Sequence, residues 1–203
     1  MDSTSNIKQL NTTRGTFKKS DFFMLPNILC YIRIIMIPIF VILFYKKLFW
    51  QSALVAILAS ITDVVDGYIA RTFDMKTDWG MFLDPLADKL MQLAMLICSI
   101  FKAPWILILV IIFLIKEFTM LFYGIFVYRK GRNLDGAIWC GKLCTVILDL
   151  SLFYVIAAPE KYLTPVTVTG IICLCTIFLL MSFGIYMQKY FMLYKETKST
   201  TNF

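Results

Sequence analysis

Six long apolar stretches alternate with short polar links along the 203-residue chain. Each stretch is close to the roughly 20 residues that an α-helix needs to cross the hydrocarbon core of a bilayer. The pattern therefore predicts an all-α integral membrane protein with six transmembrane helices, and it places them over residues 26–45, 48–70, 81–101, 104–128, 137–158 and 165–188.

Polar segments flank this apolar block at both ends. Residues 1–25 are rich in Ser, Thr, Asn and Lys and end in a short stretch that is either an interfacial segment or simply the entry into the first helix. They lack an apolar core followed by a small-residue cleavage site, so no cleavable signal peptide is expected. Residues 191–203 form a basic polar tail. We therefore expect one membrane domain over residues 26–190.

Basic residues are distributed unevenly over the predicted links. Six helices place both termini on one side of the membrane, and that side holds most of the Lys and Arg residues. The opposite side has only Lys46, Lys47, Lys102 and Lys161. Since positively charged links stay in the cytoplasm, both termini are predicted to be cytoplasmic and the protein to lie in the cell membrane. The same bias explains the net charge of +7 without a nucleic-acid partner, which we do not expect.

The residue composition limits which catalytic groups and metal ligands the chain can use. Charged residues make up 16% of the chain, against about a quarter in soluble domains. The chain has no histidine, which excludes Ser-His catalysis and His-ligated zinc and leaves a carboxylate as the favoured general base, with Lys or Tyr as weaker options. The six cysteines form no CxxC pair and are predicted to be small buried hydrophobes.

Four aspartates lie inside or beside apolar sequence, where carboxylates are costly and mark candidate functional sites. Asp63 and Asp66 fall near the end of the second predicted helix, and Asp84 and Asp88 near the start of the third. Consecutive helices joined by a short link run antiparallel, so all four carboxylates are expected at the same, cytoplasmic, face. Asp63 and Asp66 share a helix face with Gly67 and Ala70, and Asp84 shares one with Asp88.

Converging carboxylates repel one another, and divalent cations would neutralise them. A two-metal site is typical of phosphoryl chemistry, and all-oxygen ligands favour Mg²⁺ or Mn²⁺. Structural alternatives exist for each part. Asp84 could cap a helix that has Pro85 at its first position, and Gly67 with Ala70 could form a helix-packing face. Asp63 and Asp66 could form ion pairs with Arg33, Lys89 or Lys116.

The stretch from Asp63 to Asp88 reads D-x2-D-G-x2-A-R-x8-G-x3-D-x3-D, which resembles the signature of the CDP-alcohol phosphatidyltransferase family. Pro26-Asn27-Ile28-Leu29 with Arg33 resembles the first-helix motif of that family. Gly141-Lys142 followed by Thr145 is similar to its Gly-Lys-x-x-Thr motif. Two positions depart from the family: Cys30 stands where Thr is common, and Asp149 where Gln is expected.

The resemblance implies a role for each matching residue. Asp63, Asp66, Asp84 and Asp88 would bind the two metal ions, and Asp88 would also be the general base. The CDP-lipid would be held by Asn27, Gly67, Ala70, Arg71, Thr77 and Gly80. An acceptor phosphate needs a cationic cradle, and the candidates are Lys142, Arg129, Arg132 and Lys116, whose alternative role is ordinary cytoplasmic charge. A homodimer is implied by analogy.

The resemblance also implies an activity. We expect metal-dependent transfer of a phosphatidyl group from CDP-diacylglycerol to a hydroxyl acceptor, with glycerol 3-phosphate favoured, and release of CMP. Phosphatidylglycerol as acceptor, as in cardiolipin synthase, or another acceptor of the family is the alternative. A small cation transporter with a carboxylate site is the alternative from a different class.

Overall fold

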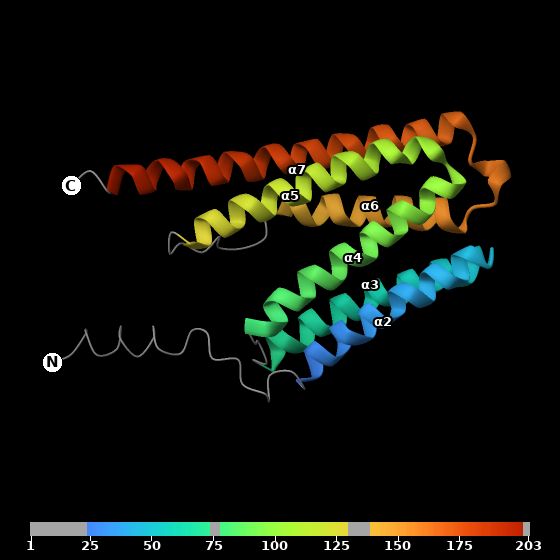
Figure 1. The fold of residues 1–203 in the computed structure, drawn as a ribbon, viewed down its shortest axis with the longest axis horizontal. Helices are drawn as coiled ribbons and strands as arrows, with labels where there is room; N and C mark the ends of the chain where they lie inside the picture. Colours follow the sequence, from blue (N-terminus) through green and yellow to red (C-terminus); the bar gives the residue numbers. More distant parts are fainter. Residues whose placement is uncertain (1–23, 74–77, 130–138, 201–203) are drawn as a thin grey trace. The chain divides into compact units, whose positions relative to one another are not determined.

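The structure is a computed structural model that describes residues 24–73, 78–129 and 139–200, and these residues are helical apart from short turns (Figure 1). The chain forms two compact units, Met1–Ala94 and Met95–Phe203, whose boundary falls inside one helix. The helices are α2 (Leu25–Tyr45), α3 (Phe49–Thr72), α4 (Asp78–Lys102), α5 (Leu107–Arg129), α6 (Trp139–Ala157) and α7 (Pro165–Thr200).

In the first unit, α2 and α3 lie side by side as an antiparallel pair (Figure 1). A tight turn joins them, in which Lys47 adopts a positive φ of 60° and the Phe44 and Phe49 rings meet edge to face at 5.3 Å between centroids. On α3 the buried positions include Ala53, Ala56 and Ala59. Their spacing of three residues puts them on one face, where small side chains allow the two backbones to approach closely.

The first turns of α4 belong to the same unit and contact α2. The indole Nε1 of Trp79 donates a hydrogen bond of 2.8 Å to the Tyr31 hydroxyl. Because α4 begins at Asp78, both Asp84 and Pro85 lie inside the helix. The alternative in which Asp84 caps the helix is therefore wrong. Pro85 has no amide hydrogen, so the carbonyl of residue 81 loses its helical partner just before the aspartates.

The second unit contains the end of α4 and the helices α5, α6 and α7, with α7 packed against both α5 and α6. One face of α7 is buried through Val168, Cys175, Leu179 and Ser182, whose spacings of 7, 4 and 3 residues fit a single helical stripe. Lys102, the last residue of α4, donates hydrogen bonds of 3.2, 2.8 and 2.7 Å to the carbonyls of Val155, Ile156 and Ala158. It thereby satisfies carbonyls at the end of α6 that have no helical partner.

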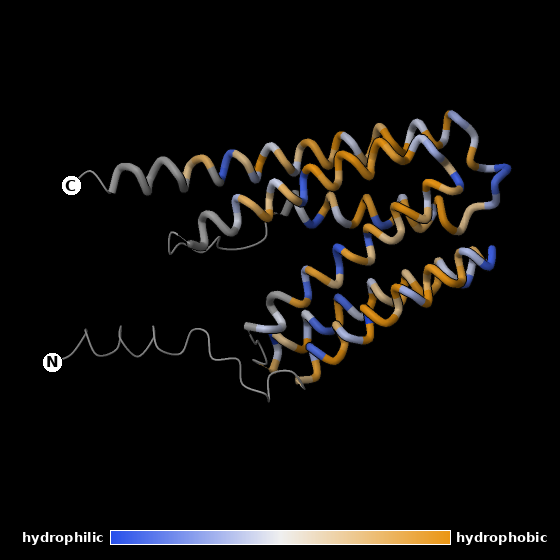
Figure 2. The backbone as a smooth tube through the Cα atoms, in the orientation of Figure 1, coloured by the Kyte–Doolittle hydropathy of each residue, from blue (hydrophilic) through white to orange (hydrophobic). Residues whose placement is uncertain are grey.

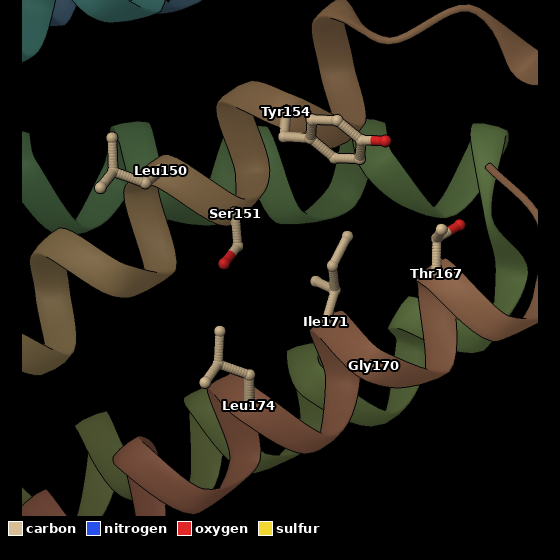
Figure 3. A pocket seen from close by; sticks show the side chains of 7 residues that line it. All are labelled: Leu150, Ser151, Tyr154, Thr167, Gly170, Ile171 and Leu174. Carbon is tan, nitrogen blue, oxygen red and sulfur yellow. The ribbon is translucent and has the colours of Figure 1, made fainter. Parts of the chain in front are cut away.

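An open groove of about 430 Å³ lies between α6 and α7. Figure 3 shows side chains from both helices facing this space. It is mainly apolar, and its lining comes from Leu150, Ser151 and Tyr154 on α6 and from Thr167, Gly170, Ile171 and Leu174 on α7.

Four segments are long and apolar enough to cross a membrane: Leu25–Tyr45, Phe49–Thr72, Pro104–Gly124 and Pro165–Lys189. Figure 2 shows apolar residues along these helices and hydrophilic ones at the turns that join α2 to α3 and α6 to α7. The structure thus confirms an all-helical fold among the described residues, with helices at all six predicted positions. Spanning by α4 and α6 and the cytoplasmic termini stay predictions.

Several helix ends differ from the predicted ones; α4, for example, begins at Asp78 and not at residue 81. The fourth apolar stretch opens with a short 3-10 turn, Pro104–Ile106, before α5 begins. At the other end of the chain, α7 continues well beyond residue 188, to Thr200. After Gly184 this segment contains neither Gly nor Pro, so nothing in the polar tail interrupts the helix.

Candidate functional site

Three buried polar residues line one face of α2: Asn27, Cys30 and Arg33. Their spacing of three residues brings them to the same side of the helix. Arg33 is 1% exposed, and because an arginine stays charged when it is buried, it needs anionic partners to offset the cost of burying that charge. The partners are the aspartates of α3 and α4.

The guanidinium of Arg33 joins the three helices of this unit. Its Nη1 lies 2.9 Å from Oδ1 of Asp63 and 3.1 Å from Oδ1 of Asp84, and its Nη2 donates to Oδ2 of Asp66. Asp66 is 2% exposed, whereas the side chains of Asp63 and Asp84 are 37% and 42% exposed. The carboxylates therefore converge as predicted, and of the suggested ion pairs the one with Arg33 is present.

Cys30 belongs to the same cluster. Its thiol lies 3.6 Å from Oδ2 of Asp66 and 3.8 Å from Oδ1 of Asp84, and it donates a hydrogen bond toward these acids. The prediction that every cysteine is a buried hydrophobe is wrong here, because this thiol contacts charged groups. It is also wrong for Cys173, which is exposed on α7.

Asp88 lies one helical turn beyond Asp84 on α4 and is half-buried. Its carboxylate interacts electrostatically with that of Asp63. All four predicted aspartates therefore belong to one local cluster formed by α3 and α4, at the ends of the two helices that the sequence predicts. In the contacts described above, three carboxylates share the single positive charge of Arg33, so these contacts by themselves leave negative charge in excess.

The donor set suits a divalent cation. One donor atom each from Cys30, Asp66 and Asp84 lies within 4.8 Å of the other two. Carboxylate oxygens are the ligands that Mg²⁺ and Mn²⁺ prefer, and the negative charge of the aspartates would attract a divalent cation. The side chains present thus fit a metal ion, although they do not select one.

The residues predicted to hold the CDP-lipid occupy the same unit. Gly67 follows Asp66 on α3, and a Cβ at this position would lie 3.5 Å from Nη2 of Arg71, so the Arg71 side chain folds back over the glycine. Ala70 and Gly80 are half-buried, and Arg71 itself is exposed. Asn27 is buried in the first turn of α2. Thr77 lies outside the described residues.

The residues predicted to bind an acceptor phosphate belong to the second unit. Lys142 is exposed near the start of α6. Lys116 is buried in α5, and its Nζ forms an ion pair of 2.7 Å with Oε1 of Glu117. Lys116 and Glu117 are neighbours in sequence and do not share a helix face, but their long side chains bend toward each other. Arg129 ends α5, but its side chain and the whole of Arg132 lie outside the described residues.

Sequence reasoning misses the place of Arg33 and Cys30 in this cluster. It gives Arg33 as one of several structural partners and as part of the first-helix motif, and Cys30 as a hydrophobe and as a departure from the family pattern, but it does not join either residue to the aspartates as a group. The available signal is their spacing: Asn27, Cys30 and Arg33 recur every three residues in an otherwise apolar helix. A polar stripe inside a membrane helix points to polar partners on the neighbouring helices.

Comparison with known proteins identifies a protein family whose model the chain matches. The family model described as CDP-alcohol phosphatidyltransferase matches residues 23–182. The chain is also similar to bacterial proteins named CDP-diacylglycerol–glycerol-3-phosphate 3-phosphatidyltransferase, among them those of the following three species. That of Pectobacterium atrosepticum is 29% identical over 155 residues, which cover 73% of this chain and 85% of the relative. Those of Salmonella typhimurium and Escherichia coli K12 are 32% and 31% identical over 144 residues, covering 68% of this chain and 79% of each relative.

Proposed function

The chain belongs to the CDP-alcohol phosphatidyltransferase family, and we propose that it transfers a phosphatidyl group from CDP-diacylglycerol to glycerol 3-phosphate with release of CMP. The single observation that carries the proposal is the cluster of family aspartates on α3 and α4 around one buried guanidinium. The names of the bacterial relatives support this donor and this acceptor.

Asp63, Asp66, Asp84 and Asp88 would hold Mg²⁺ or Mn²⁺ in a two-metal site. When bound, the ions would offset the negative charge of the pyrophosphate and of the departing CMP. Asn27, Gly67, Ala70, Arg71, Thr77 and Gly80 would bind the CDP moiety. In this role the absence of a side chain at Gly67 and the adjacent Arg71 guanidinium would let a phosphate approach the backbone and still meet a positive charge.

Asp88 would act as the general base. Its carboxylate would take the proton from the acceptor hydroxyl, and the hydroxyl oxygen would attack the phosphorus on the lipid side of the pyrophosphate. The bond from that phosphorus to the bridging oxygen then breaks, and CMP leaves. A correctly placed base typically contributes about 10²–10⁴-fold to such a step. Asp88 suits this role because it belongs to the acidic cluster and the chain has no histidine.

The acceptor phosphate would be held by cations at the cytoplasmic ends of the later helices. Lys142 is the strongest candidate because it is exposed at the start of α6, where its ammonium group can meet a ligand. Arg129 and Arg132 would assist. The buried Lys116 would have to divide its charge between the phosphate and Glu117. The homodimer that the resemblance implies remains part of the proposal.

The proposal is tested with the purified full-length protein, CDP-diacylglycerol, and either Mg²⁺ or Mn²⁺. Release of CMP is measured with glycerol 3-phosphate, phosphatidylglycerol, inositol phosphate or serine as the acceptor. We expect release with glycerol 3-phosphate. Release only with phosphatidylglycerol would indicate the cardiolipin reaction instead, and metal flux into liposomes without CDP-lipid would indicate a transporter.

Asp88→Asn tests the base. The amide is nearly the same size as the carboxylate but cannot accept the proton, so we expect kcat to fall by about 10²-fold or more. Glu160→Gln is the matched control, since Glu160 is an exposed acid on the short turn before α7, and its activity should equal that of the wild type. Unchanged CMP release by Asp88→Asn would remove Asp88 from the mechanism.

A further inference from the structure

The position of Arg33 has a consequence for cation binding. This side chain is 1% exposed, and its two terminal nitrogens contact carboxylate oxygens of Asp63, Asp66 and Asp84. Its Nε has no hydrogen-bond partner among the described residues. Arg33 therefore interacts with the acids through the end of its guanidinium, at the point where their oxygens converge.

The charges of this group depend on one another. An arginine does not lose its proton in a protein, so Arg33 remains a cation even when buried. Without it, the three carboxylates would face one another across α3 and α4 with no positive charge among these contacts, and removing one partner from a buried ion pair is strongly destabilising. With it, a second cation at the same place is opposed by the positive charge already there.

We propose that Arg33 is an internal counter-cation that competes with the divalent metal for the carboxylates of Asp63, Asp66 and Asp84. Arg33 holds the acidic cluster together while no metal is bound, and it weakens metal binding because its guanidinium contacts oxygens that the metal would use. The inference rests on the proposed function in one respect, that the metal binds to these aspartates. In this role Arg33 is a positioning residue that sets the metal affinity.

The competition can be measured without any substrate. The full-length protein in detergent is titrated with Mn²⁺, and free Mn²⁺ is followed by electron paramagnetic resonance. Arg33→Met keeps most of the side-chain volume but removes the charge, so we expect Mn²⁺ to bind about tenfold more tightly or better than in the wild type. Lys46→Met removes a cation at the other end of α2, where Lys46 is exposed, and should leave the affinity unchanged.

Thermal unfolding provides a second reading. In EDTA, Arg33→Met should unfold at a lower temperature than the wild type, because nothing else among these contacts neutralises the carboxylates. Added Mn²⁺ should raise the unfolding temperature of Arg33→Met by more than it raises that of the wild type. If Arg33→Met folds only in the presence of Mn²⁺, this would also show that Arg33 neutralises the carboxylates while no metal is bound.

Two further variants make the test decisive. Arg33→Lys keeps the charge but loses the fork of the guanidinium, so its affinity for Mn²⁺ should lie between those of the wild type and Arg33→Met. Adding Asp66→Asn to Arg33→Met should abolish the gain, because the gained affinity resides in these carboxylates. Unchanged or weaker Mn²⁺ binding in Arg33→Met, or in Arg33→Lys if Arg33→Met cannot be purified, would overturn the inference. Failure of the proposed function would appear separately, as absent CMP release in a wild type that binds Mn²⁺.

Discussion

At the scale of single residues, the structure explains one departure from the family pattern, which is Cys30 at a position where threonine is common. Its thiol belongs to the acidic cluster and donates toward the buried carboxylate of Asp66 over 3.6 Å. A threonine hydroxyl, which the family commonly has at this position, could make the same hydrogen bond. The departure therefore preserves a donor, and it does not leave the carboxylate with an apolar neighbour.

The matched substitutions Cys30→Thr and Cys30→Val test this interpretation, because Thr and Val have the same shape and only Thr can donate. Losing a hydrogen bond to a buried charged group costs about 1–3 kcal/mol, so we expect Cys30→Val to unfold at a lower temperature than Cys30→Thr. The measurement is thermal unfolding of the purified variants in detergent. Equal stability of the two variants would show that the thiol contributes no hydrogen bond.

The residues of this cluster also show what sequence can predict. The spacing of Asp63, Asp66, Asp84 and Asp88 is sufficient to place them on two helix faces that meet. It does not decide the partner of these acids, because Arg33, Lys89 and Lys116 are equally plausible from charge alone. Choosing among them requires knowing which face of α2 contacts α3 and α4, and that depends on packing between segments 33 or more residues apart in the chain.

At the scale of helices, Gly141 shows how two elements meet. A Cβ on this residue of α6 would lie 2.7 Å from the hydroxyl oxygen of Tyr186 on α7 and 3.0 Å from the ring carbon Cε2. The tyrosine ring thus lies directly against Gly141, and a larger side chain there would require Tyr186 to move. Apolar periodicity predicts both helices, but it cannot predict this contact, which joins positions far apart in the sequence.

Gly141→Ala and Gly184→Ala form a matched pair that tests the contact. Gly184 lies on α7, and a Cβ added to it would meet no neighbouring atom of the described residues within 4 Å, so alanine there should raise helix stability by up to about 1 kcal/mol. At Gly141 the same gain is opposed by overpacking, which typically costs about 1–3 kcal/mol. We therefore expect Gly141→Ala to unfold at a lower temperature than Gly184→Ala.

A third variant identifies the atom responsible. Tyr186→Phe removes the hydroxyl oxygen, which is the nearest atom to the added methyl group. Combined with Gly141→Ala, it should recover part of the lost stability. If Gly141→Ala is as stable as Gly184→Ala, the close approach of Tyr186 does not restrict this position.

At the scale of the whole molecule, the number of membrane crossings decides which links face the cytoplasm. Four segments meet the requirements of length and apolarity for a span. α4 is 25 residues long, enough to cross, but it carries Asp84, Asp88 and Lys89 near one end. Sequence reasoning counts α4 and α6 as spans because polar residues near a helix end can reach the membrane surface. Whether these polar residues do reach the surface depends on where the bilayer lies along each helix.

Reporter domains inserted into the full-length chain distinguish six crossings from four. With six, a reporter at residue 103, after α4, lies outside the cytoplasm, and one between residues 130 and 138 lies inside it. If only the four segments cross, both positions are reversed, whereas the turn at residues 46–48 is outside in either case and serves as the control. We expect alkaline phosphatase to be active at residue 103 and inactive between residues 130 and 138, because the latter link carries Arg132 beside Arg129 and Lys130 and positive links stay in the cytoplasm. The reverse pattern would place the link between α5 and α6 on the far side of the membrane from the acidic cluster, and Arg129 and Arg132 could then not bind the acceptor phosphate.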